Sequence, residues 1–469
     1  MYEVPKQYYF RIHHVRPRFK GDIENVLIYM ATEISKIPEQ PERDFANQLN
    51  NAIRRYPGNG IREIKTINNW RTEISSLFGF YIVENGKTRP GQRAIDLANK
   101  EDLVEAFKVF LYSFQYPGAH IKPHEILKQI EEGIHFKPVQ YILQVYAAAE
   151  KNEGKRIGLS KEEVCHCIFN DLRCTAGLET PLDTWCRIKH NRDLNVCYDA
   201  TGDVIRYAGD IIDYMEIANL VVSHDSKVYY TNTLENEAIL KFINSTEWFS
   251  GYDSMISKKS GSLEAIKSCI PAWYKYVNRD ISHTDFATDI LAFISSNEQE
   301  YESLQRSRDE TYAQLLDQDE IKTKDIGDIG ESLVHSHECQ RIKNGGRFDL
   351  IHLIKRIPTQ FAVGYDIQSV ELDERKRYIE VKTTISSKPL HFNKIHMTPN
   401  EWNTAGTMKD RYFVYRLMIS KSEKKLYIIQ DPVGLYKKDI IDMVPKDGAD
   451  ITFETATAGN YEELLTWVS

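Results

Sequence analysis

The sequence lacks the hallmarks of membrane and secreted proteins. No apolar run approaches the roughly 18 residues that a membrane-spanning helix needs, and residues 1–6 (Met-Tyr-Glu-Val-Pro-Lys) lack the apolar segment of a signal peptide. Cysteine is also scarce: the chain has seven in 469 residues, an odd number that fits reduced thiols better than a disulfide framework. We therefore expect a cytoplasmic protein made of ordinary globular domains.

Most of the cysteines fall within one short region. Five lie between residues 165 and 197, with His166 and His190 nearby: Cys165, Cys167, Cys174, Cys186 and Cys197. The C-x₂-C spacing of many zinc sites is missing, and residues 165 and 167 would face different sides of a helix. Buried, unreactive thiols are the simpler interpretation, and a tetrahedral zinc site is the alternative.

Acidic residues outnumber basic ones in the whole chain, but not at its amino-terminal end. The net charge is −8, yet residues 1–118 carry 17 Lys and Arg against 14 Asp and Glu, which gives +3 there and −11 for the rest. The basic residues gather at 11–20 and 54–71, and the second stretch also holds asparagines and glycines. Because Lys and Arg hold phosphates while Arg and Asn contact base edges, these stretches indicate nucleic-acid binding. A solvated loop is the alternative for the second stretch alone.

The same region has the element order of a winged helix-turn-helix. Its predicted elements are helices at 22–36, 43–55 and 66–78, a hairpin of 80–83 with 87–90 around Asn85-Gly86, and a closing helix at 91–98. We expect the helix at 67–78 to enter the major groove. The side chains expected to contact DNA are Arg16, Arg18, Arg54, Arg55, Asn68, Asn69, Arg71 and Thr72.

A second, weaker copy of this pattern is predicted at about 119–250. Ser160 and Glu163 form a capping box, residues 203–219 are helical, 220–231 form a wing, and 234–243 close the module. Tandem winged helices ahead of a separate nuclease domain resemble the FokI- and AlwI-type restriction endonucleases. The alternative is that one or both modules only pack or dimerise.

Residues 251–320 are predicted to connect the two halves of the chain. A Ser/Lys/Gly stretch at 257–262 is a flexible break, an amphipathic helix follows at 282–297, and a highly charged helix at 297–324. A helix this charged is usually a solvated spacer. It could instead form a short dimer contact.

Near the carboxyl end, two strands are predicted to carry a group of charged side chains. Residues 363–367 and 377–384 are rich in β-branched and aromatic residues. Glu380 and Lys382 share one face of the second strand because alternate residues of a strand point the same way. If residues 373–375 form the connecting loop, Asp366 falls opposite Lys382 on that face, whereas a slip of one residue would place it on the other face.

This arrangement fits phosphodiester chemistry. Asp366, Glu380 and the Val381 carbonyl form a hard oxygen site that suits Mg²⁺, and Lys382 can orient the attacking water and offset developing negative charge. The Asp…Glu-x-Lys pattern resembles the signature of the PD-(D/E)XK nucleases, with Tyr365 in place of their loosely kept proline. The alternative is a solvent-facing hairpin with a cross-strand Asp–Lys pair.

The flanking segments extend the resemblance. Upstream, Gly330-Glu331 lies at the start of a predicted helix, and downstream Thr398-Pro-Asn-Glu-Trp402 opens another, with Thr398 as its cap. Over about 320–445 the chain resembles the NO VEIN carboxyl-terminal endonuclease-like domain, with further strands at 411–419 and 425–430. The resemblance implies that Asp366, Glu380 and Lys382 are catalytic, with Glu331 a further acid of the metal site. It also places Asn400 or Glu401 nearby, although Glu401 is equally explained as a capping residue.

The sequence thus predicts a multidomain α+β protein in which tandem winged helix-turn-helix domains precede an α/β PD-(D/E)XK nuclease domain. The expected parts are 1–118, 119–250, the linker 251–320 and the nuclease domain 321–469. We expect a Mg²⁺-dependent type II restriction-like deoxyribonuclease that binds double-stranded DNA and serves phage defence, with a homodimer or sequential nicking for double-strand cleavage. The alternatives are a defence or repair nuclease for modified, branched or single-stranded nucleic acid, and a DNA-binding regulator with a silent nuclease fold.

Overall fold

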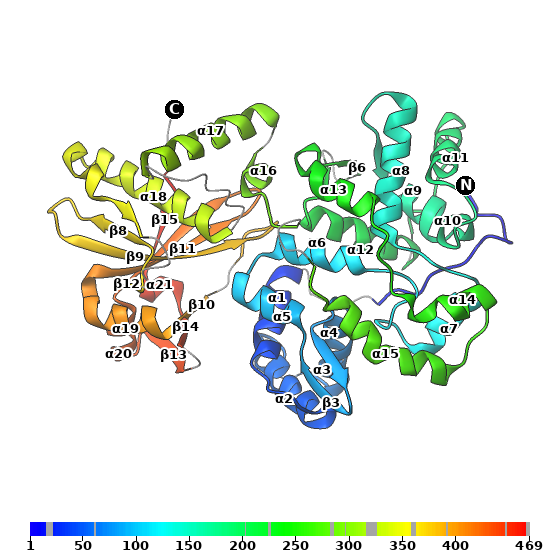
Figure 1. The fold of residues 1–469 in the computed structure, drawn as a ribbon, viewed down its shortest axis with the longest axis horizontal. Helices are drawn as coiled ribbons and strands as arrows, with labels where there is room; N and C mark the ends of the chain where they lie inside the picture. The colour runs from blue at the N-terminus through cyan, green and yellow to red at the C-terminus, as the bar shows by residue number, and fades with distance from the viewer. Residues whose placement is uncertain are drawn as a thin grey trace. The chain divides into compact units, whose positions relative to one another are not determined.

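The chain forms two compact units. The computed structural model describes residues 1–15, 22–60, 62–201, 203–223, 227–281, 286–295, 297–315, 326–357, 363–390, 393–445 and 448–465. Its units are Met1–Phe286 and Ala287–Ser469. Each combines helices with small sheets, the mixed α+β class that the sequence predicts (Figure 1). Within the described ranges, no helix has the length and apolar character to cross a membrane.

The first unit opens with helices around a small sheet. Its first ten elements are α1 (Ile23–Ser35), β1 (Gln40–Pro41), α2 (Glu42–Arg55), α3 (Ile64–Asn69), a π-helical turn (Trp70–Ile74), α4 (Ser75–Phe78), β2 (Tyr81–Glu84), β3 (Lys87–Pro90), α5 (Gln92–Lys100) and α6 (Leu103–Ser113). The strands form an antiparallel sheet in the order β1-β3-β2. The hairpin turn has positive φ at Asn85 and Gly86, as an Asn-Gly turn between strands requires.

The helical run from α3 to α4 follows the predicted core spacing. Ile67, Trp70 and Ile74 are buried, as are Leu77 and Phe78. Gly79 then ends the run with a φ of 69°, a left-handed conformation that favours glycine. The predicted helix at 66–78 is therefore present, with a π-helical turn in its middle.

The rest of the first unit is mainly helical. Its elements are α7 (Pro123–Glu131), α8 (Pro138–Glu153), β4 (Gly158–Ser160), α9 (Lys161–Val164), a π-helical turn (Cys165–Phe169), α10 (Leu172–Thr175), α11 (Pro181–Asp193), α12 (Asp203–Ile217), β5 (Val221–Ser223), β6 (Val228–Thr231), α13 (Asn236–Ile243), α14 (Asp253–Lys258) and α15 (Leu263–Val277). The strands pair in the order β4-β6-β5. The predicted capping box of Ser160 and Glu163 is present at α9.

Buried contacts join the two expected modules of this unit. Lys108 of α6 and Glu235 form a buried ion pair with an N–O distance of 2.8 Å. The Tyr214 ring of α12 packs against Phe78, Phe107 and Phe110. Residues 1–118 and 119–250 therefore share a core.

Helix α15 completes the same core, although residues 251–320 were expected to form a linker. Trp273, Tyr274 and Val277 are buried in a cluster that includes Ile82 of β2. The Tyr274 hydroxyl lies 2.8 Å from the Ser76 hydroxyl, and the Asn278 side-chain amide donates to the Gly79 carbonyl at 2.9 Å. Residues 251–281 thus pack within the first unit.

The second unit is built around a six-stranded sheet. Its elements are α16 (Ile290–Ile294), α17 (Glu298–Leu315), α18 (Ile326–Asn344), β7 (Lys355–Arg356), β8 (Ile367–Val370), β9 (Lys376–Ile385), β10 (Lys394–Met397), α19 (Pro399–Met408), β11 (Tyr412–Ile419), β12 (Lys424–Gln430), α20 (Pro432–Lys437), β13 (Ile441–Pro445), β14 (Ala449–Phe453), α21 (Thr455–Ala458) and β15 (Asn460–Glu463). The main sheet has the order β15-β12-β11-β9-β8-β7, and β10-β14-β13 form a second sheet. Only β9 and β11 pair in parallel within the described part of the main sheet.

The two faces of the main sheet have different neighbours. Helix α18 lies along one face, and α19, α20 and the small sheet gather on the other (Figure 1). The core on the second side includes Tyr378, Tyr412 and Tyr427, together with Met397 and Ile451 of the small sheet. Strand β9 therefore has its side chains covered on both faces.

Candidate active site and nucleic-acid interface

The predicted charged group lies on one face of β9. Alternation along the strand points Arg377 and Thr383 toward α18, and Tyr378, Glu380 and Lys382 toward α19. The pairing of β8 with β9 matches Ile367 with Ile379, so Asp366 falls across from Glu380. The expected register, with Asp366 opposite Lys382, was wrong by two residues because the turn spans Glu371–Arg375, where the Glu371 N–H donates to the Arg375 carbonyl at 2.7 Å. A shift of two residues keeps the same face, so Asp366 still joins the group.

Asp366 is held in place by a glycine turn and by strand β9. Gly364 has a φ of 79°, and its carbonyl accepts a hydrogen bond from the Tyr412 hydroxyl at 2.8 Å. The Asp366 carboxylate accepts from the Val381 backbone N–H at 2.8 Å. Burial raises the pKa of Asp366 despite this hydrogen bond. The carboxylate is thus fixed in a place where its negative charge is poorly solvated.

Lys382 lies between two carboxylates. Its Nζ is 2.8 Å from Glu380 Oε1 and 2.9 Å from Glu401 Oε2. Although burial alone would lower it, these two carboxylates hold the pKa of Lys382 above its ordinary value, so the amine is protonated. Burial, with the charges of Asp366 and Glu401, raises the pKa of Glu380 well above its usual range even though Lys382 opposes this shift. The face therefore carries an excess of buried acid over base.

Glu401 takes part in both arrangements that the sequence left open. It forms a capping box with Thr398, whose backbone N–H donates to Glu401 Oε2 at 3.0 Å. The same oxygen accepts from Lys382 Nζ. The carboxylate that caps α19 thus also positions the lysine.

Glu331 comes from the other side of β9. It follows Gly330, where a Cβ atom would collide with Thr383 Oγ1, so the glycine allows α18 to lie against the strand. Arg356 of β7 contacts Glu331 Oε2 at 2.6 Å and also contacts Asp328 at 3.4 Å. Burial and the charge of Asp366 raise the pKa of Glu331 to about 7 although Arg356 opposes the shift. Arg356 was not predicted from the sequence, because a two-residue strand has no periodic pattern and is formed only by its pairing with β8.

The donors on this face suit a hard divalent cation. Asp366 and Glu380 are two carboxylates with raised pKa values, and a cation between them would relieve the cost of their buried charge. Mg²⁺ commonly takes one or two protein carboxylates and completes its shell with water and phosphate. Across the described residues, no group of three or more His, Cys, Asp and Glu side chains is arranged to hold a metal ion. Glu331 therefore does not join the pair as the structure places it.

The expected DNA-contact residues fall into three sets. Asn68 and Arg71 both contact Asn50 of α2, at 3.4 and 3.3 Å, while Asn69 and Thr72 are exposed beside them. Arg55 pairs with Glu33 at 2.7 Å, and Arg54 donates to the Arg62 carbonyl. Arg16 and Arg18 lie outside the described residues. Sequence reasoning missed Asn50, which links α2 to the helix expected to enter the groove.

Three of the clustered cysteines are interior residues. Cys165, Cys167 and Cys174 are buried, and burial raises the pKa of the Cys167 thiol to about 11. Cys186 and Cys197 are exposed. A buried cysteine with a raised pKa is poorly suited to be a thiolate.

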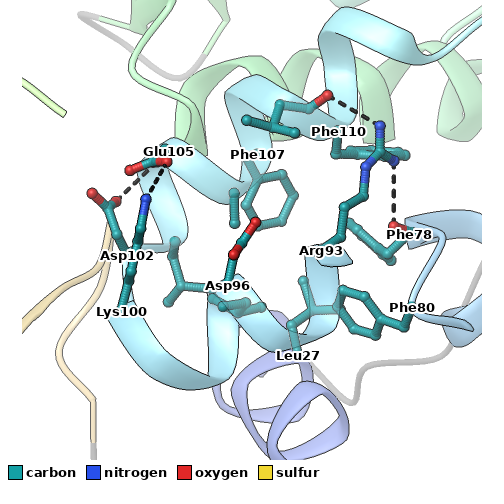
Figure 2. A pocket seen from close by; sticks show the side chains of 14 residues that line it. Leu27, Phe78, Phe80, Arg93, Asp96, Lys100, Asp102, Glu105, Phe107 and Phe110 are labelled. Atoms are coloured by element: carbon teal, nitrogen blue, oxygen red, sulfur yellow. Dashed lines mark hydrogen bonds and ion pairs between the residues drawn. The ribbon is translucent and has the colours of Figure 1, made fainter. Parts of the chain in front are cut away.

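An apolar pocket of the first unit lies between α1, α5 and α6 (Figure 2). Its walls include Leu27, Phe80 and Phe107. Arg93 donates from its guanidinium to the carbonyls of Phe78 and Val109, both at 3.3 Å. Burial lowers the pKa of Arg93 to about 9. The guanidinium thus ties the end of α4 to α6 beside the pocket.

Both parts of the chain match known protein families. Residues 2–274 match the sequence profile of the family described as restriction endonuclease BpuJI, N-terminal. The chain belongs to this family. Residues 330–429 match the profile of the NO VEIN protein, C-terminal domain. The NO VEIN resemblance is confirmed. The resemblance of the first half to restriction endonucleases is also confirmed, but the matching family is BpuJI and not FokI or AlwI.

A solved structure resembles the BpuJI-family region in fold. It is described as the crystal structure of pyrene- and phenanthrene-modified DNA in complex with the BpuJI endonuclease binding domain. The match has a TM-score of 0.52 and 24% identity, and covers 58% of this chain and 99% of that one. Among curated proteins no match was found. The structural likeness concerns the fold of the first unit.

Proposed function

We propose that this protein is a sequence-specific DNA endonuclease of the type II restriction kind. The observation that carries the proposal is that Asp366, beside β8, joins Glu380 and Lys382 of β9 on one face of the sheet, in a chain of the BpuJI family. In this proposal the first unit binds double-stranded DNA through winged helix-turn-helix modules. The second unit is a PD-(D/E)XK nuclease domain.

We assign distinct tasks to the residues of the site. Asp366, Glu380 and the Val381 carbonyl would hold Mg²⁺, which when bound polarises the phosphodiester and lowers the pKa of a coordinated water. Lys382, kept protonated by Glu380 and Glu401, would orient the attacking water and stabilise charge on the phosphate. One such site cuts one strand, so double-strand cleavage would require a homodimer or two successive nicks.

In the first unit, the exposed Asn69 and Thr72 and the neighbouring Asn68 and Arg71 would contact base edges. Arg71 is oriented for this by Asn50, to which it donates a hydrogen bond. Arg54 and Arg55, together with Arg16 and Arg18, would hold phosphates. The basic charge of residues 1–118 supports this assignment.

The test is digestion of methylated and unmethylated plasmid and phage DNA with Mg²⁺, followed by sequencing of the ends. Asp366→Ala and Glu380→Ala should each lower the cleavage rate by at least about 10²-fold, as loss of a catalytic group does, while specific DNA binding persists. Lys382→Ala should be similarly inactive and still bind Mg²⁺. Defined ends produced by the wild type alone would support the proposal.

Other outcomes would favour the alternatives. Binding to a defined sequence without cleavage under any of these conditions would indicate a DNA-binding regulator with a silent nuclease fold. Cleavage restricted to modified, branched or single-stranded substrates would indicate a defence or repair nuclease. Retention of more than about one part in a hundred of the wild-type rate in Asp366→Ala would contradict the assigned site.

A further inference from the structure

Most of the acids around β9 are already paired with side-chain cations. Lys382 contacts Glu380 and Glu401, and Arg356 contacts Glu331, all within 2.9 Å. Arg416 of β11 is buried beside Lys382 and donates to Thr384 Oγ1 at 3.2 Å on the same face. With Asp366, the group thus holds four carboxylates and three cationic side chains, and Asp366 and Glu380 are the two acids placed to share one divalent ion.

A fifth carboxylate, Asp328, lies at the exposed edge of the group. Asp328 contacts Arg356 at 3.4 Å from the start of α18, and 36% of its side chain is exposed. An exposed charge is screened by water and salt. Asp328 therefore adds little to the cost of the negative charge buried in this group.

Glu331 is already paired with Arg356. Gly330 brings α18 against Thr383, on the face of β9 opposite to Lys382. Arg356 then holds Glu331 through both Nε and a terminal nitrogen, at 3.2 and 2.6 Å. The side chain that could extend the Asp366–Glu380 pair toward a second ion is thus already neutralised.

We propose that the site takes a single divalent cation, and that the Arg356 guanidinium fills the place that a second cation has in two-metal nucleases. The inference rests on the proposed function and specifies its metal requirement. Two-metal sites place their ions roughly 3.5–4 Å apart and need acids for both. Here a second ion would have to displace the guanidinium from a largely buried pair, and removal of one partner from such a pair is strongly unfavourable.

The experiment counts bound Mn²⁺ on the full-length protein by electron paramagnetic resonance and by calorimetric titration. The wild type should bind one ion, and Glu331→Gln should still bind one. Arg356→Gln should bind two, because it frees Glu331, and the double variant Arg356→Gln/Glu331→Gln should return to one. Arg347→Gln is the matched control: Arg347 also pairs with two acids, Asp349 and Glu374, and should leave the count at one.

Each departure from this pattern has a defined meaning. Two ions on the wild type, or loss of the ion in Glu331→Gln, would overturn the inference and leave the proposed nuclease intact. No ion on the wild type would overturn both. If Arg356→Gln fails to fold by circular dichroism, the counts for the wild type and Glu331→Gln still decide between one ion and two. Asp366→Asn should bind none, which fixes the counted ion to this site.

Discussion

At the scale of single residues, one oxygen atom carries two tasks. Glu401 Oε2 accepts hydrogen bonds from the Thr398 backbone N–H and from Lys382 Nζ. The sequence predicted the capping box from its Thr-x-x-Glu spacing, because capping is local. It left the contact with Lys382 open, because that contact depends on how α19 packs on the sheet.

Two substitutions should separate the tasks. Thr398→Ala removes the side-chain cap and should lower stability by about 1 kcal/mol, with the cleavage rate little changed. Glu401→Gln keeps an acceptor for the backbone but removes the negative charge beside Lys382, and should lower the rate about 10–100-fold, as loss of a supporting partner does. Thermal melts and single-turnover cleavage measure the two effects. A Glu401→Gln protein with the wild-type rate would show that the carboxylate only caps the helix.

The face on which Asp366 lies was predicted from the sequence, but its partner on β9 was not. Alternation fixed the faces of Glu380 and Lys382 without knowledge of the turn. The partner of Asp366 depended on the number of turn residues, and the turn spans Glu371–Arg375 where three residues were expected. The face was predicted correctly only because the error was an even number of residues.

At the scale of elements, a buried carboxylate fastens α18 to the sheet. Glu338 pairs with Arg341 at 2.7 Å and accepts from the hydroxyls of Ser369 and Tyr415, at 2.6 and 2.8 Å. Burial alone would raise its pKa, but these partners and Arg377 lower it to about 2. The helix that carries Glu331 is thus anchored by a charge that is fully satisfied.

Glu338→Ala should cost about 3–5 kcal/mol, because it leaves buried arginines without their partner. Glu423→Ala, which removes a partly exposed pair with Lys425, is the control and should cost less than about 1 kcal/mol. Because the folded pKa of Glu338 is depressed, its contribution is present above about pH 4.5 and is lost as the pH falls toward 2. Urea unfolding of both variants at pH 7 and pH 3 measures this. An equal cost at both pH values would contradict the linkage.

The helical run of α3 and α4 should contact DNA through its exposed side. Asn69→Ala should weaken specific binding by about 1–3 kcal/mol if Asn69 makes a bidentate base contact, and its exposure means that stability should not change. Asn50→Ala should weaken binding through Arg71. Titration with specific and scrambled duplexes measures both. Equal loss on the two duplexes would mean that these residues contact phosphates.

The bounds of the first helix of the second unit differ from those predicted. The sequence suggested a helix over 282–297, but the described part is helical only at Ile290–Ile294. Asp289 caps this helix by accepting from the Ala292 N–H at 3.1 Å. The apolar spacing was right for a helix, and a competing local hydrogen bond set where it begins.

At the scale of the whole molecule, the first unit extends beyond the expected second module. The sequence suggested a boundary near residue 250, because a Ser/Lys/Gly stretch follows. Trp273, Tyr274 and Val277 nevertheless return to the hairpin of β2 and β3. Such long-range packing leaves no local sequence signal.

Truncation should reveal this boundary. A fragment of residues 1–286 should fold and bind the specific duplex, whereas a fragment of residues 1–250 should be destabilised, because it exposes the surface that Trp273 and Tyr274 cover. Residues 287–469 should cut, if at all, without sequence preference. Circular dichroism, binding titrations and cleavage assays test the three fragments. Cleavage at defined sequences by residues 287–469 would move recognition into the second unit.

The return of α15 has a consequence for synthesis on the ribosome. Segments of the first unit contact residues that are synthesised much later. The Tyr2 N–H donates to the Cys197 carbonyl, and strand β2 packs against Tyr274 of α15. Contacts between distant segments slow folding because a long loop must close first. Slightly more than three-fifths of the chain must emerge before the first unit is complete. Translation is therefore expected to expose this apolar surface for longer than in a protein whose first domain is built from neighbouring segments, and chaperone binding to nascent chains should concentrate there.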